Sequence, residues 1–560
     1  MNLTKLAAVT AVTLALVGCE GGDVVIDASD NSTNTDNSTN VGGGGTTNPC
    51  ASYLTDPDDA ATRVQGTFDG QNCNYDSTFA GEDNPLLVNL TIPRIAGAHV
   101  FEDSLFVGAN TDIAPTPQAP DAPSADGTVP DGVVLTIAAG ATLAWTQSSD
   151  YLLINRGSQI IADGSPSAPI IFTSLSDVNG SVDPEAVAQW GGIVINGNGI
   201  TNKCTDEQRA TDACHVVSEG KPSNFGGNNN AESSGVLRYV QVKHTGFEVA
   251  DGDELNGVTF NAVGSGTAVE NLQAYSTSDD GVEFFGGAVN VLNYVGLYVN
   301  DDSIDYADGY VGSVTNALVI HGLNTGNRCI EGDNIGSGDF NQEPRTSPVV
   351  NNLTCIVSAQ DGSIRGDSEG PLYRRGVGTI LTNSITADSW ARLNLGREGN
   401  ECFELNNAET YAVAEAGVQT NVTASIIACE EATKDDNDGA GFFTSGEDLT
   451  SWYTNAAGNS DFNTGTAVIT DSINANIVAL NGIYTAPVCS DTGCDFVDDL
   501  GNTATIVPAA VTGGATNGEG NPIVGAVSAD NDWTAGWTFG LQSTSNGGRL
   551  WFDPATGAAP

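Results

Sequence analysis

The amino-acid sequence predicts an all-β solenoid, a single-stranded parallel β-helix with loop insertions. From Val100 onward, short runs of β-branched and aliphatic residues alternate with turns rich in glycine, asparagine and aspartate. These turns are too short to hold crossover helices, so the strands do not belong to βαβ units. The middle of the chain also repeats itself at an interval that suits one coil of a β-helix.

The repeat is visible in two acidic segments. Residues 301–309 repeat the pattern of residues 279–287 at an offset of 22 residues, and residues 327–333 form a more divergent third copy. A coil of this kind buries its inward side chains only when the next coil stacks on it. We therefore expect aliphatic side chains to pile up inside the solenoid and asparagine or aromatic ladders to form at its corners. About 400 residues at this period predict roughly fifteen to eighteen coils.

The chain begins with the layout of a secretory signal, residues 1–18, in which Lys5 precedes a short apolar run. This run is too short to span a bilayer, which needs ~20 apolar residues. Residues 16–19, Leu-Val-Gly-Cys, resemble the bacterial lipobox. The resemblance implies cleavage before Cys19, which then receives a diacylglycerol group and an N-acyl chain such as palmitate. Several acyl chains on one residue suffice for stable anchoring. The alternative is an ordinary secreted protein with a chance cysteine.

Residue 20 indicates the destination of such a lipoprotein. An aspartate at this position resembles an inner-membrane retention signal, and the chain has Glu20 instead. We therefore expect a lipid anchor in the bacterial outer membrane, with the protein on the periplasmic side or exposed at the cell surface.

The remaining chain divides into four segments. Residues 19–48 are polar and glycine-rich and predict a flexible tether. Residues 49–94 are expected to cap the solenoid, residues 95–500 to form the β-helix, and residues 501–560 to form a linker and a C-terminal cap. Trp533, Trp537 and Trp551 are expected to close the end of the repeat array, which would otherwise leave an exposed edge. The alternative is that these tryptophans stack on sugar rings.

Ten cysteines remain after Cys19, and an even number in an exported chain predicts disulfides. Sequence does not fix the connectivity, and we expect each cysteine to pair with its nearest neighbour. The pairs would be Cys50 with Cys73, Cys204 with Cys214, Cys329 with Cys355, Cys402 with Cys429, and Cys489 with Cys494. Zinc or redox chemistry is the alternative, and only His215 lies next to a cysteine.

The chain is strongly acidic, with 70 aspartate and glutamate residues, 18 lysine and arginine residues and a formal net charge of −52. Nucleic acid and anionic membrane surfaces would be repelled by such a body, so we expect no nucleic-acid partner. Cationic partners such as divalent metals remain open. Solubility in a salty habitat explains the charge as well.

Several segments resemble a known family, the uncharacterised right-handed parallel β-helix surface lipoproteins of bacteria, which have a pectin-lyase-like fold. The matching segments are residues 133–140, 156–164, 190–197, 280–287, 301–310 and 533–538. The resemblance covers roughly residues 95–545 and implies a right-handed solenoid. It implies no particular reaction, because a fold shared with polysaccharide-active enzymes does not carry their function.

Carboxylates dominate the repeated segments. If the 22-residue register holds, one coil places its three acidic residues above three of the next coil, and Glu331 extends the row. Stacked strands are ~4.8 Å apart, so the carboxylates repel unless a cation lies between them. Ca²⁺, which takes six to eight oxygen ligands, is the candidate cofactor. The alternative is that these segments are turns in water. The candidate ligands are Asp279, Asp280, Glu283, Asp301, Asp302 and Asp305.

Arginines gather in one region, residues 345–397, which is the candidate substrate-binding groove. A polysaccharide lyase needs a base together with groups that neutralise the substrate carboxylate. Salt bridges along a β-helix face are the alternative explanation. The candidate residues are Arg365, Arg374, Arg375, Arg392 and Arg397, with Arg345 nearby.

The function that these features favour is binding. We expect a non-catalytic surface protein, an adhesion or structural module whose long face binds a glycan, a matrix component or a partner protein. The membrane would be contacted through the N-terminal lipid alone. The alternative is a polysaccharide lyase or another carbohydrate-active enzyme acting at residues 345–397. No catalytic residue is assigned, because base, metal and substrate-clamping groups do not form a recognisable arrangement.

Anchoring can be tested by changing the acylated residue. The Cys19→Ser protein should leave the membrane fraction and appear in the soluble fraction, because it has lost its acyl chains. Fractionation of cells that express the wild type and the variant measures the difference. An unchanged membrane-bound share in the variant would contradict the prediction.

Overall fold

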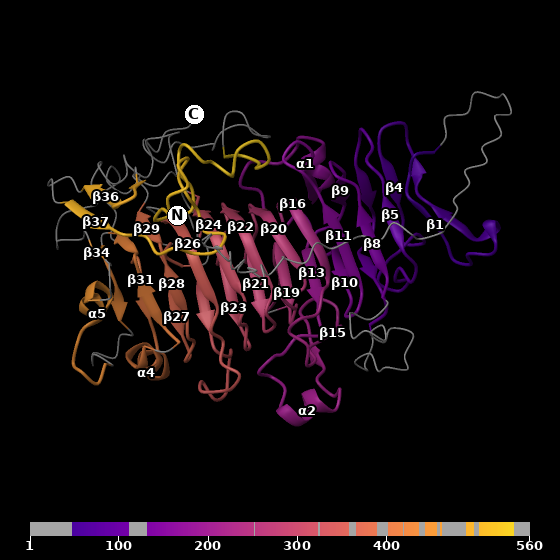
Figure 1. The fold of residues 1–560 in the computed structure, drawn as a ribbon. Coiled ribbons are helices and arrows are strands. Elements are labelled where there is room, and N and C mark those ends of the chain that lie inside the picture. Colours follow the sequence, from indigo (N-terminus) through magenta and orange to yellow (C-terminus); the bar gives the residue numbers. More distant parts are fainter. Residues whose placement is uncertain are drawn as a thin grey trace, which may run out of the picture. The chain divides into compact units, whose positions relative to one another are not determined.

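Short parallel strands, stacked in register from coil to coil, form the framework of the folded chain (Figure 1). The structure, a computed structural model, describes residues 48–110, 132–250, 252–322, 325–357, 366–388, 401–417, 419–429, 431–435, 443–455, 460–461, 489–497 and 503–541. The expected signal, Cys19 and all but the last residue of the expected tether lie outside these ranges. None of the helices within them is both long and apolar enough to cross a lipid bilayer.

A ten-stranded parallel sheet forms one face of the solenoid, one strand per coil. Its strands are β7 (Leu105–Val107), β10 (Tyr151–Ile154), β13 (Gly192–Asn196), β19 (Val258–Asn261), β21 (Val282–Phe285), β23 (Ile304–Ala307), β25 (Glu331–Asp333), β27 (Leu372–Arg374), β30 (Glu404–Leu405) and β33 (Lys434–Asp435).

An eighteen-stranded sheet supplies the other two faces. Its first strands are β3 (Thr67–Phe68), β4 (Cys73–Tyr75), β5 (Leu90–Ile92), β6 (His99–Phe101), β8 (Val134–Ile137), β9 (Thr142–Trp145), β11 (Gln159–Asp163) and β12 (Ile170–Ser174). The long strands are β16 (Gly235–Lys243), β20 (Ala268–Tyr275), β22 (Asn290–Leu297), β24 (Ser313–Ile320) and β26 (Val349–Val357). The last are β28 (Ile380–Thr382), β29 (Ile385–Asp388), β31 (Asn421–Thr423), β32 (Ile426–Ala428) and β34 (Ser460–Asp461).

Smaller elements lie outside the two large sheets. The antiparallel pieces are β1 (Ser52–Leu54) with β2 (Arg63–Gln65), β14 (Val216–Val217) with β15 (Asn224–Phe225), β17 (Phe247–Ala250) with β18 (Asp253–Leu255), and β35 (Cys489–Ser490) with β36 (Gly493–Val497) and β37 (Thr503–Ile506). The helices are the 3-10 turn η1 (Ala60–Thr62) and α1 (Leu175–Val178), α2 (Asp206–Ala210), α4 (Ala408–Ala416) and α5 (Leu449–Asn455).

An asparagine ladder marks the corner at which the long strands bend. Asn271, Asn293 and Asn316 occupy equivalent positions and have φ angles of 57°, 63° and 60°. Asparagine tolerates this left-handed region better than most residues. The Asn293 Nδ2 atom donates to Asn271 Oδ1 at 3.0 Å, and Asn316 Nδ2 donates to Asn293 Oδ1 at 2.8 Å. The expected corner ladder is confirmed.

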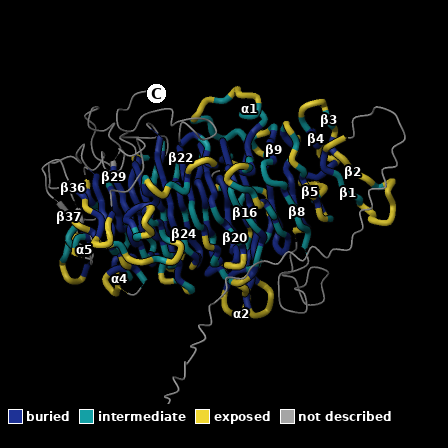
Figure 2. The backbone as a smooth tube through the Cα atoms, turned by 45° about the horizontal axis from the view of Figure 1, so that its top comes forward, coloured by how far each residue is buried: buried dark blue, intermediate teal, exposed yellow. Residues whose placement is uncertain are grey.

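The interior is apolar and stacked, as the repeat predicted. Figure 2 shows the buried residues on the strands and the exposed residues in the loops at the edges. Aromatic rings add to the aliphatic stack: the Trp145 and Trp190 rings lie 4.3 Å apart and almost parallel, and the Phe260 and Phe284 rings lie 5.2 Å apart. Burial of this kind stabilises a fold by about 25 cal/mol per Å² of apolar surface. The all-β parallel β-helix is therefore confirmed.

The coil count and the boundaries differ from the sequence-based expectation. The ten-stranded sheet shows ten coils within the described ranges, and the parallel bridge between Leu86 and Val107 adds one turn before them, against the fifteen to eighteen expected. The repeat period underestimates the coil length because insertions enlarge several coils, notably the one between β13 and β19. The parallel stack also begins before residue 95, since β4 already pairs in parallel with β6, and the antiparallel β35–β37 sheet occupies the region around residue 500.

Five disulfides join the ten cysteines in the expected nearest-neighbour pairs. Cys329–Cys355 and Cys402–Cys429 lie buried in the solenoid interior. Because all ten thiols are consumed, the alternative of a cysteine-ligated metal is wrong.

The described C-terminal residues, 503–541, lie along the side of the solenoid, which corrects the expected position of Trp533 and Trp537 at its end. In Figure 1 they form the yellow trace beside the long strands. Trp537 is fully buried and its ring meets that of Tyr239 on β16, an early coil. Asn352 Nδ2 donates to the Ile523 carbonyl at 2.8 Å. The segment covers an apolar outer face of the sheet and buries it from water. Trp551 lies outside the described residues.

Removal of the Trp537 side chain should destabilise the protein by about 3–5 kcal/mol, because it leaves a cavity between the segment and the sheet. Urea denaturation of the Trp537→Ala protein measures the loss. Leu87→Ala is the control: Leu87 is 60% exposed, and its change should stay within about 0.5 kcal/mol. Equal stability of the two variants would contradict the lateral packing.

Candidate functional site

A row of acidic side chains crosses the ten-stranded sheet. Glu283 on β21 is paired with Asp305 on β23, which in turn is paired with Glu331 on β25. The 22-residue register expected from the sequence is therefore present. Thr259 precedes this row in the stack and Leu372 follows it, so three successive coils carry the charge.

A second row occupies the turns just before these strands. The Asp280 backbone N–H donates to Asn256 Oδ1 at 3.1 Å, the Asp302 N–H donates to Asp280 Oδ1 at 3.0 Å, and the Arg328 N–H donates to Asp302 Oδ1 at 2.8 Å. The side chains of Asn256, Asp280 and Asp302 thus each accept a hydrogen bond from the backbone of the next coil. Asp280 and Asp302 are only 6% and 5% exposed. The alternative that these segments are solvated turns is therefore wrong.

The two rows form the wall of a cavity of about 210 Å³, called here the acidic pocket. Two of its carboxylates come from hairpins outside the coil repeat: Glu219 lies between β14 and β15, and Glu254 lies on β18. All nine ionisable groups in the described lining are carboxylates. The lining residues are Glu219, Glu254, Asn256, Asp279, Asp280, Glu283, Asp301, Asp302, Asp305, Asn327 and Glu331.

The carboxylates are close enough to share cations. Three groups of three residues each offer ligand oxygens within 4.8 Å of one another. Asp280 and Asp305 each belong to two groups, so neighbouring groups overlap. The groups are Asp279 with Asp280 and Asp301, Asp280 with Glu283 and Asp305, and Asp302 with Asp305 and Glu331. A donor set of oxygen atoms alone fits a hard divalent cation such as Ca²⁺.

The charges perturb one another strongly. Burial, followed by repulsion from Asp305, raises the pKa of Asp280 well above its ordinary value, and burial followed by repulsion from Glu331 does the same to the pKa of Asp305. Burial raises the pKa of Glu331 to about 7 and, with repulsion from Asp279, raises the pKa of Glu219 to about 8. An empty pocket would therefore take up protons near neutral pH, and a bound cation would replace them.

Arginines close one end of the acidic row. Arg374 pairs with Glu331 and with Asp333, its Nε atom lying 2.8 Å from Asp333 Oδ1. The Arg375 Nη1 atom lies 2.5 Å from Asp333 Oδ2. Both expected substrate-binding arginines thus hold carboxylates of the protein itself, as the salt-bridge alternative describes. Buried Arg345 donates to the Gly376 carbonyl. Arg365, Arg392 and Arg397 lie outside the described residues.

A family model for the pectate-lyase like beta helix domain matches residues 124–538. The chain belongs to this family. Membership suggests carbohydrate-related binding or activity. No curated protein and no solved structure matches the chain.

The sequence predicted the pocket carboxylates that lie on the repeated coils. It did not predict those that lie on insertions between the coils. Glu219 lies beyond the Cys204–Cys214 disulfide, and Glu254 lies on a hairpin between two coils. Neither follows the 22-residue repeat, so periodicity could not bring them to the site. The available signal was that both insertions contain acidic residues.

Protein freed of divalent cations should lose thermal stability as pH rises. Carboxyl groups with raised pKa values bind more protons in the folded protein than in the unfolded chain, so stability falls between about pH 4.5 and about pH 8. Calorimetry in a chelator measures the melting temperature across this range.

Two double variants control this measurement. Asp280→Asn with Asp305→Asn should flatten the slope, because two of the repelling charges are gone. The double change Asp58→Asn with Asp83→Asn alters exposed aspartates and should leave the pH dependence of the melting temperature unchanged. A wild-type melting temperature independent of pH would contradict the account.

Proposed function

We propose that the protein binds a divalent cation, Ca²⁺ before others, in the acidic pocket and uses it to hold an acidic glycan. The observation that carries the proposal is a cavity of about 210 Å³ whose nine ionisable lining groups are all carboxylates. So many negative charges in a partly buried site are costly unless protons or cations neutralise them.

Calcium suits the pocket better than other biological cations. The pocket offers carboxylate and amide oxygens, and Ca²⁺ takes six to eight oxygen ligands at flexible angles. Mg²⁺ requires near-ideal octahedral geometry and keeps most of its water, and Zn²⁺ favours cysteine and histidine ligands. The overlapping carboxylate groups accommodate more than one cation.

The bound cation would select the ligand. An acidic glycan is repelled by the bare pocket, and a Ca²⁺ ion with open coordination positions can join a uronate carboxylate to the carboxylates of the protein. A neutral glycan gains less from such an ion. Family membership supports a carbohydrate ligand in preference to a partner protein.

Binding is favoured over lyase chemistry by the composition of the pocket wall. A lyase needs a base beside the substrate, and the described lining contains neither lysine, arginine nor histidine. The basic side chains near the pocket are held in ion pairs. The Lys203 Nζ atom lies 2.7 Å from Asp308 Oδ2, and Arg374 pairs with Glu331. A polysaccharide lyase remains the alternative that the glycan experiment below tests.

The cell surface is the setting that this function requires. The lipid on Cys19 would hold the protein in the outer membrane, and the polar segment 19–48 would let the solenoid reach ligands beyond the headgroups. The net charge of −52 keeps the body itself away from anionic lipid.

Isothermal titration of the soluble Cys19→Ser protein with CaCl₂ should show binding. The double change Asp280→Asn with Asp305→Asn should weaken calcium binding about tenfold or more, equivalent to about 1.4 kcal/mol or more. Each of these residues belongs to two of the three sets of neighbouring carboxylates. The Asp58→Asn, Asp83→Asn protein should bind as the wild type does. Equal affinity of all three proteins would contradict the assignment of the site.

Polygalacturonate oligomers then test the ligand. They should bind when calcium is present, fail to bind in a chelator, and emerge chemically unchanged. Unsaturated ends, detected by ultraviolet absorbance, would overturn the non-catalytic assignment in favour of a lyase. Calcium binding without glycan binding would overturn the glycan assignment alone.

A further inference from the structure

A second cavity, of about 470 Å³, lies between two insertions that are far apart in sequence. One wall is the segment around α2 and the other is the loop of residues 334–347. The lining residues are Ile200, Asp206, Arg209, Asn228, Asn230, Gly309, Val311, Glu343 and Pro344. This cavity, called here the insertion pocket, shares none of its lining residues with the acidic pocket.

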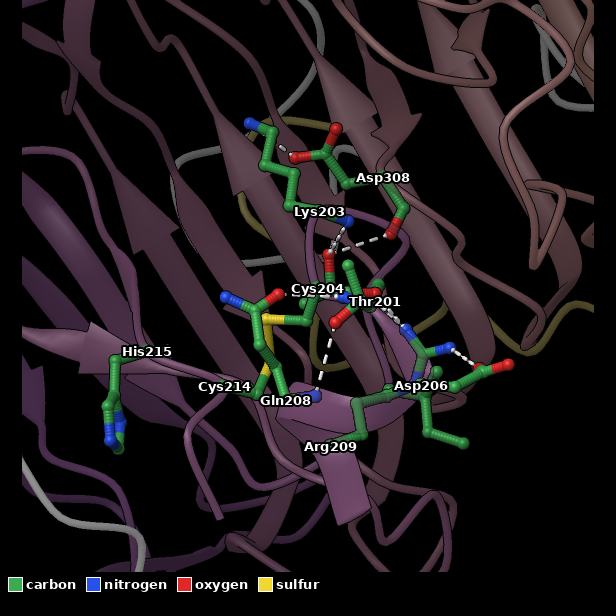
Figure 3. Close-up of a disulfide and its surroundings, with 12 residues drawn as sticks. Thr201, Lys203, Cys204, Asp206, Gln208, Arg209, Cys214, His215 and Asp308 are labelled. Carbon is green, nitrogen blue, oxygen red and sulfur yellow. Dashed lines mark hydrogen bonds and ion pairs between the residues drawn. A yellow bond between two sulfur atoms is a disulfide. The ribbon is translucent and has the colours of Figure 1, made fainter. Parts of the chain in front are cut away.

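The α2 wall is rigidly built. The Cys204–Cys214 disulfide staples the insertion, and Thr205 and Gln208 form a reciprocal capping pair at the start of α2. Figure 3 shows the Arg209 guanidinium group directed at backbone carbonyls, with Nη1 donating to Thr201 O at 2.9 Å, while it also pairs with Asp206. The Arg209 charge is therefore satisfied within the wall.

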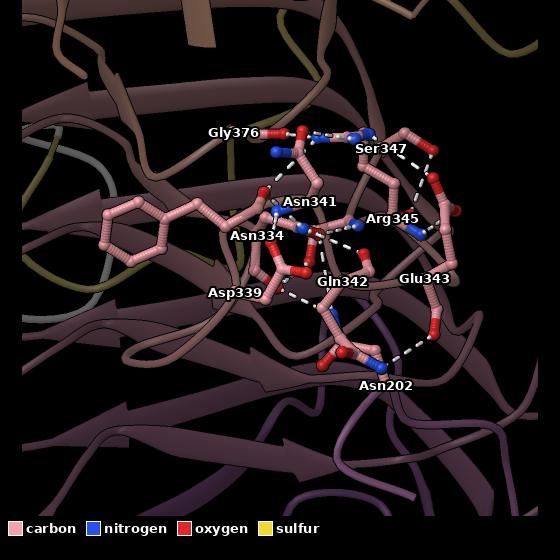
Figure 4. A network of polar contacts seen from close by, with 11 residues as sticks. Asn202, Asn334, Asp339, Asn341, Gln342, Glu343, Arg345, Ser347 and Gly376 are labelled. Carbon is pink, nitrogen blue, oxygen red and sulfur yellow. Dashed lines mark hydrogen bonds and ion pairs between the residues drawn. The ribbon is translucent and has the colours of Figure 1, made fainter. Parts of the chain in front are cut away.

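The opposite wall is fixed by a polar network, seen in Figure 4. Asn334 Nδ2 donates to the carbonyls of Phe340 and Gln342 at 3.0 and 2.9 Å, and Asn334 Oδ1 accepts from the Thr346 N–H at 2.8 Å. Asn202 Nδ2 donates to the Asn334 carbonyl at 2.8 Å and so joins the two walls. The cavity is thus formed before any ligand arrives, which lowers the cost of binding.

The lining combines hydrogen-bonding and apolar groups. Asp206 and Glu343 present carboxylate oxygens at the rim, where their side chains are 101% and 67% exposed, and Asn228 is an exposed amide. Val311 is 39% exposed, and it lines the cavity with Ile200 and Pro344. Asp206 pairs with Arg209 and Glu343 pairs with Arg345, so the described rim offers an anionic ligand no unpaired basic group.

We propose that the insertion pocket binds an uncharged sugar residue of a neutral oligosaccharide, independently of calcium. Sugar hydroxyls donate to carboxylates and accept from side-chain amides, and the C–H face of the ring packs on aliphatic side chains. The volume lies within the range of about 300–1,000 Å³ that is usual for small-molecule sites.

The insertion pocket and the acidic pocket flank the same strand. Asp305, on β23, lines the acidic pocket, and Gly309, just after β23, lines the insertion pocket. The four residues from Asp305 to Gly309 span at most about 13 Å, the length that they would have if fully extended. The two pockets are proposed to bind different ligands, so a variant that loses binding in one pocket can still be tested for binding in the other.

The test uses neutral tetrasaccharides of glucose, mannose and galactose as probes. Saturation-transfer NMR of the Cys19→Ser protein should detect at least one of them, with the same signal in calcium and in chelator. Val311→Arg, which fills the cavity, should weaken that binding about tenfold or more, and Asn228→Ala should weaken it by a smaller factor. Asp280→Asn with Asp305→Asn should leave it unchanged.

Two controls separate binding from misfolding. Val507→Arg alters a valine that is 66% exposed, and Asn179→Ala alters an exposed asparagine; both should bind as the wild type does. Melting temperatures of all variants establish that they fold. The proposal is overturned if no probe binds, if chelator abolishes the signal, or if folded Val311→Arg binds normally.

Discussion

In-register stacking of coils, about 4.8 Å apart, is the constraint on which the rest of the structure depends. It places each residue above its equivalent in the next coil, whether the contact is favourable or not. At one corner this makes a ladder in which Asn293 donates to Asn271 and accepts from Asn316. On the ten-stranded sheet the same geometry sets Glu283 above Asp305, where like charges repel.

Among the described residues, arginines offset that repulsion at one end of the row. Arg374 pairs with Glu331 and Asp333 where the acidic row ends, and Arg328 pairs with Glu369 and Glu404 in the following coils. Around Asp280 the described lining offers further carboxylates from the hairpins instead of a basic group. Buried negative charge of this density needs protons or a cation to neutralise it, and the proposed divalent cation would do so without a covalent or conformational change.

Sequence predicted what repeats and missed what interrupts the repeat. The 22-residue offset placed Asp280 above Asp302, and the expected nearest-neighbour pairing of the cysteines is confirmed. Within the described ranges the coils are fewer than predicted, because insertions such as that around α2 lengthen a coil without repeating. Glu219 and the lateral position of Trp537 could not be predicted, because both depend on tertiary contacts between segments with unrelated sequence.

The occupancy of the acidic pocket tests the central claim most directly. A crystal structure of the soluble protein grown near neutral pH with calcium, with anomalous data to identify the ion, would reveal what neutralises the carboxylates. The account predicts a calcium ion bound by oxygens of Asp280, Asp305 and their neighbours. A pocket without a cation at saturating calcium, its carboxyl groups paired through shared protons, would contradict the account.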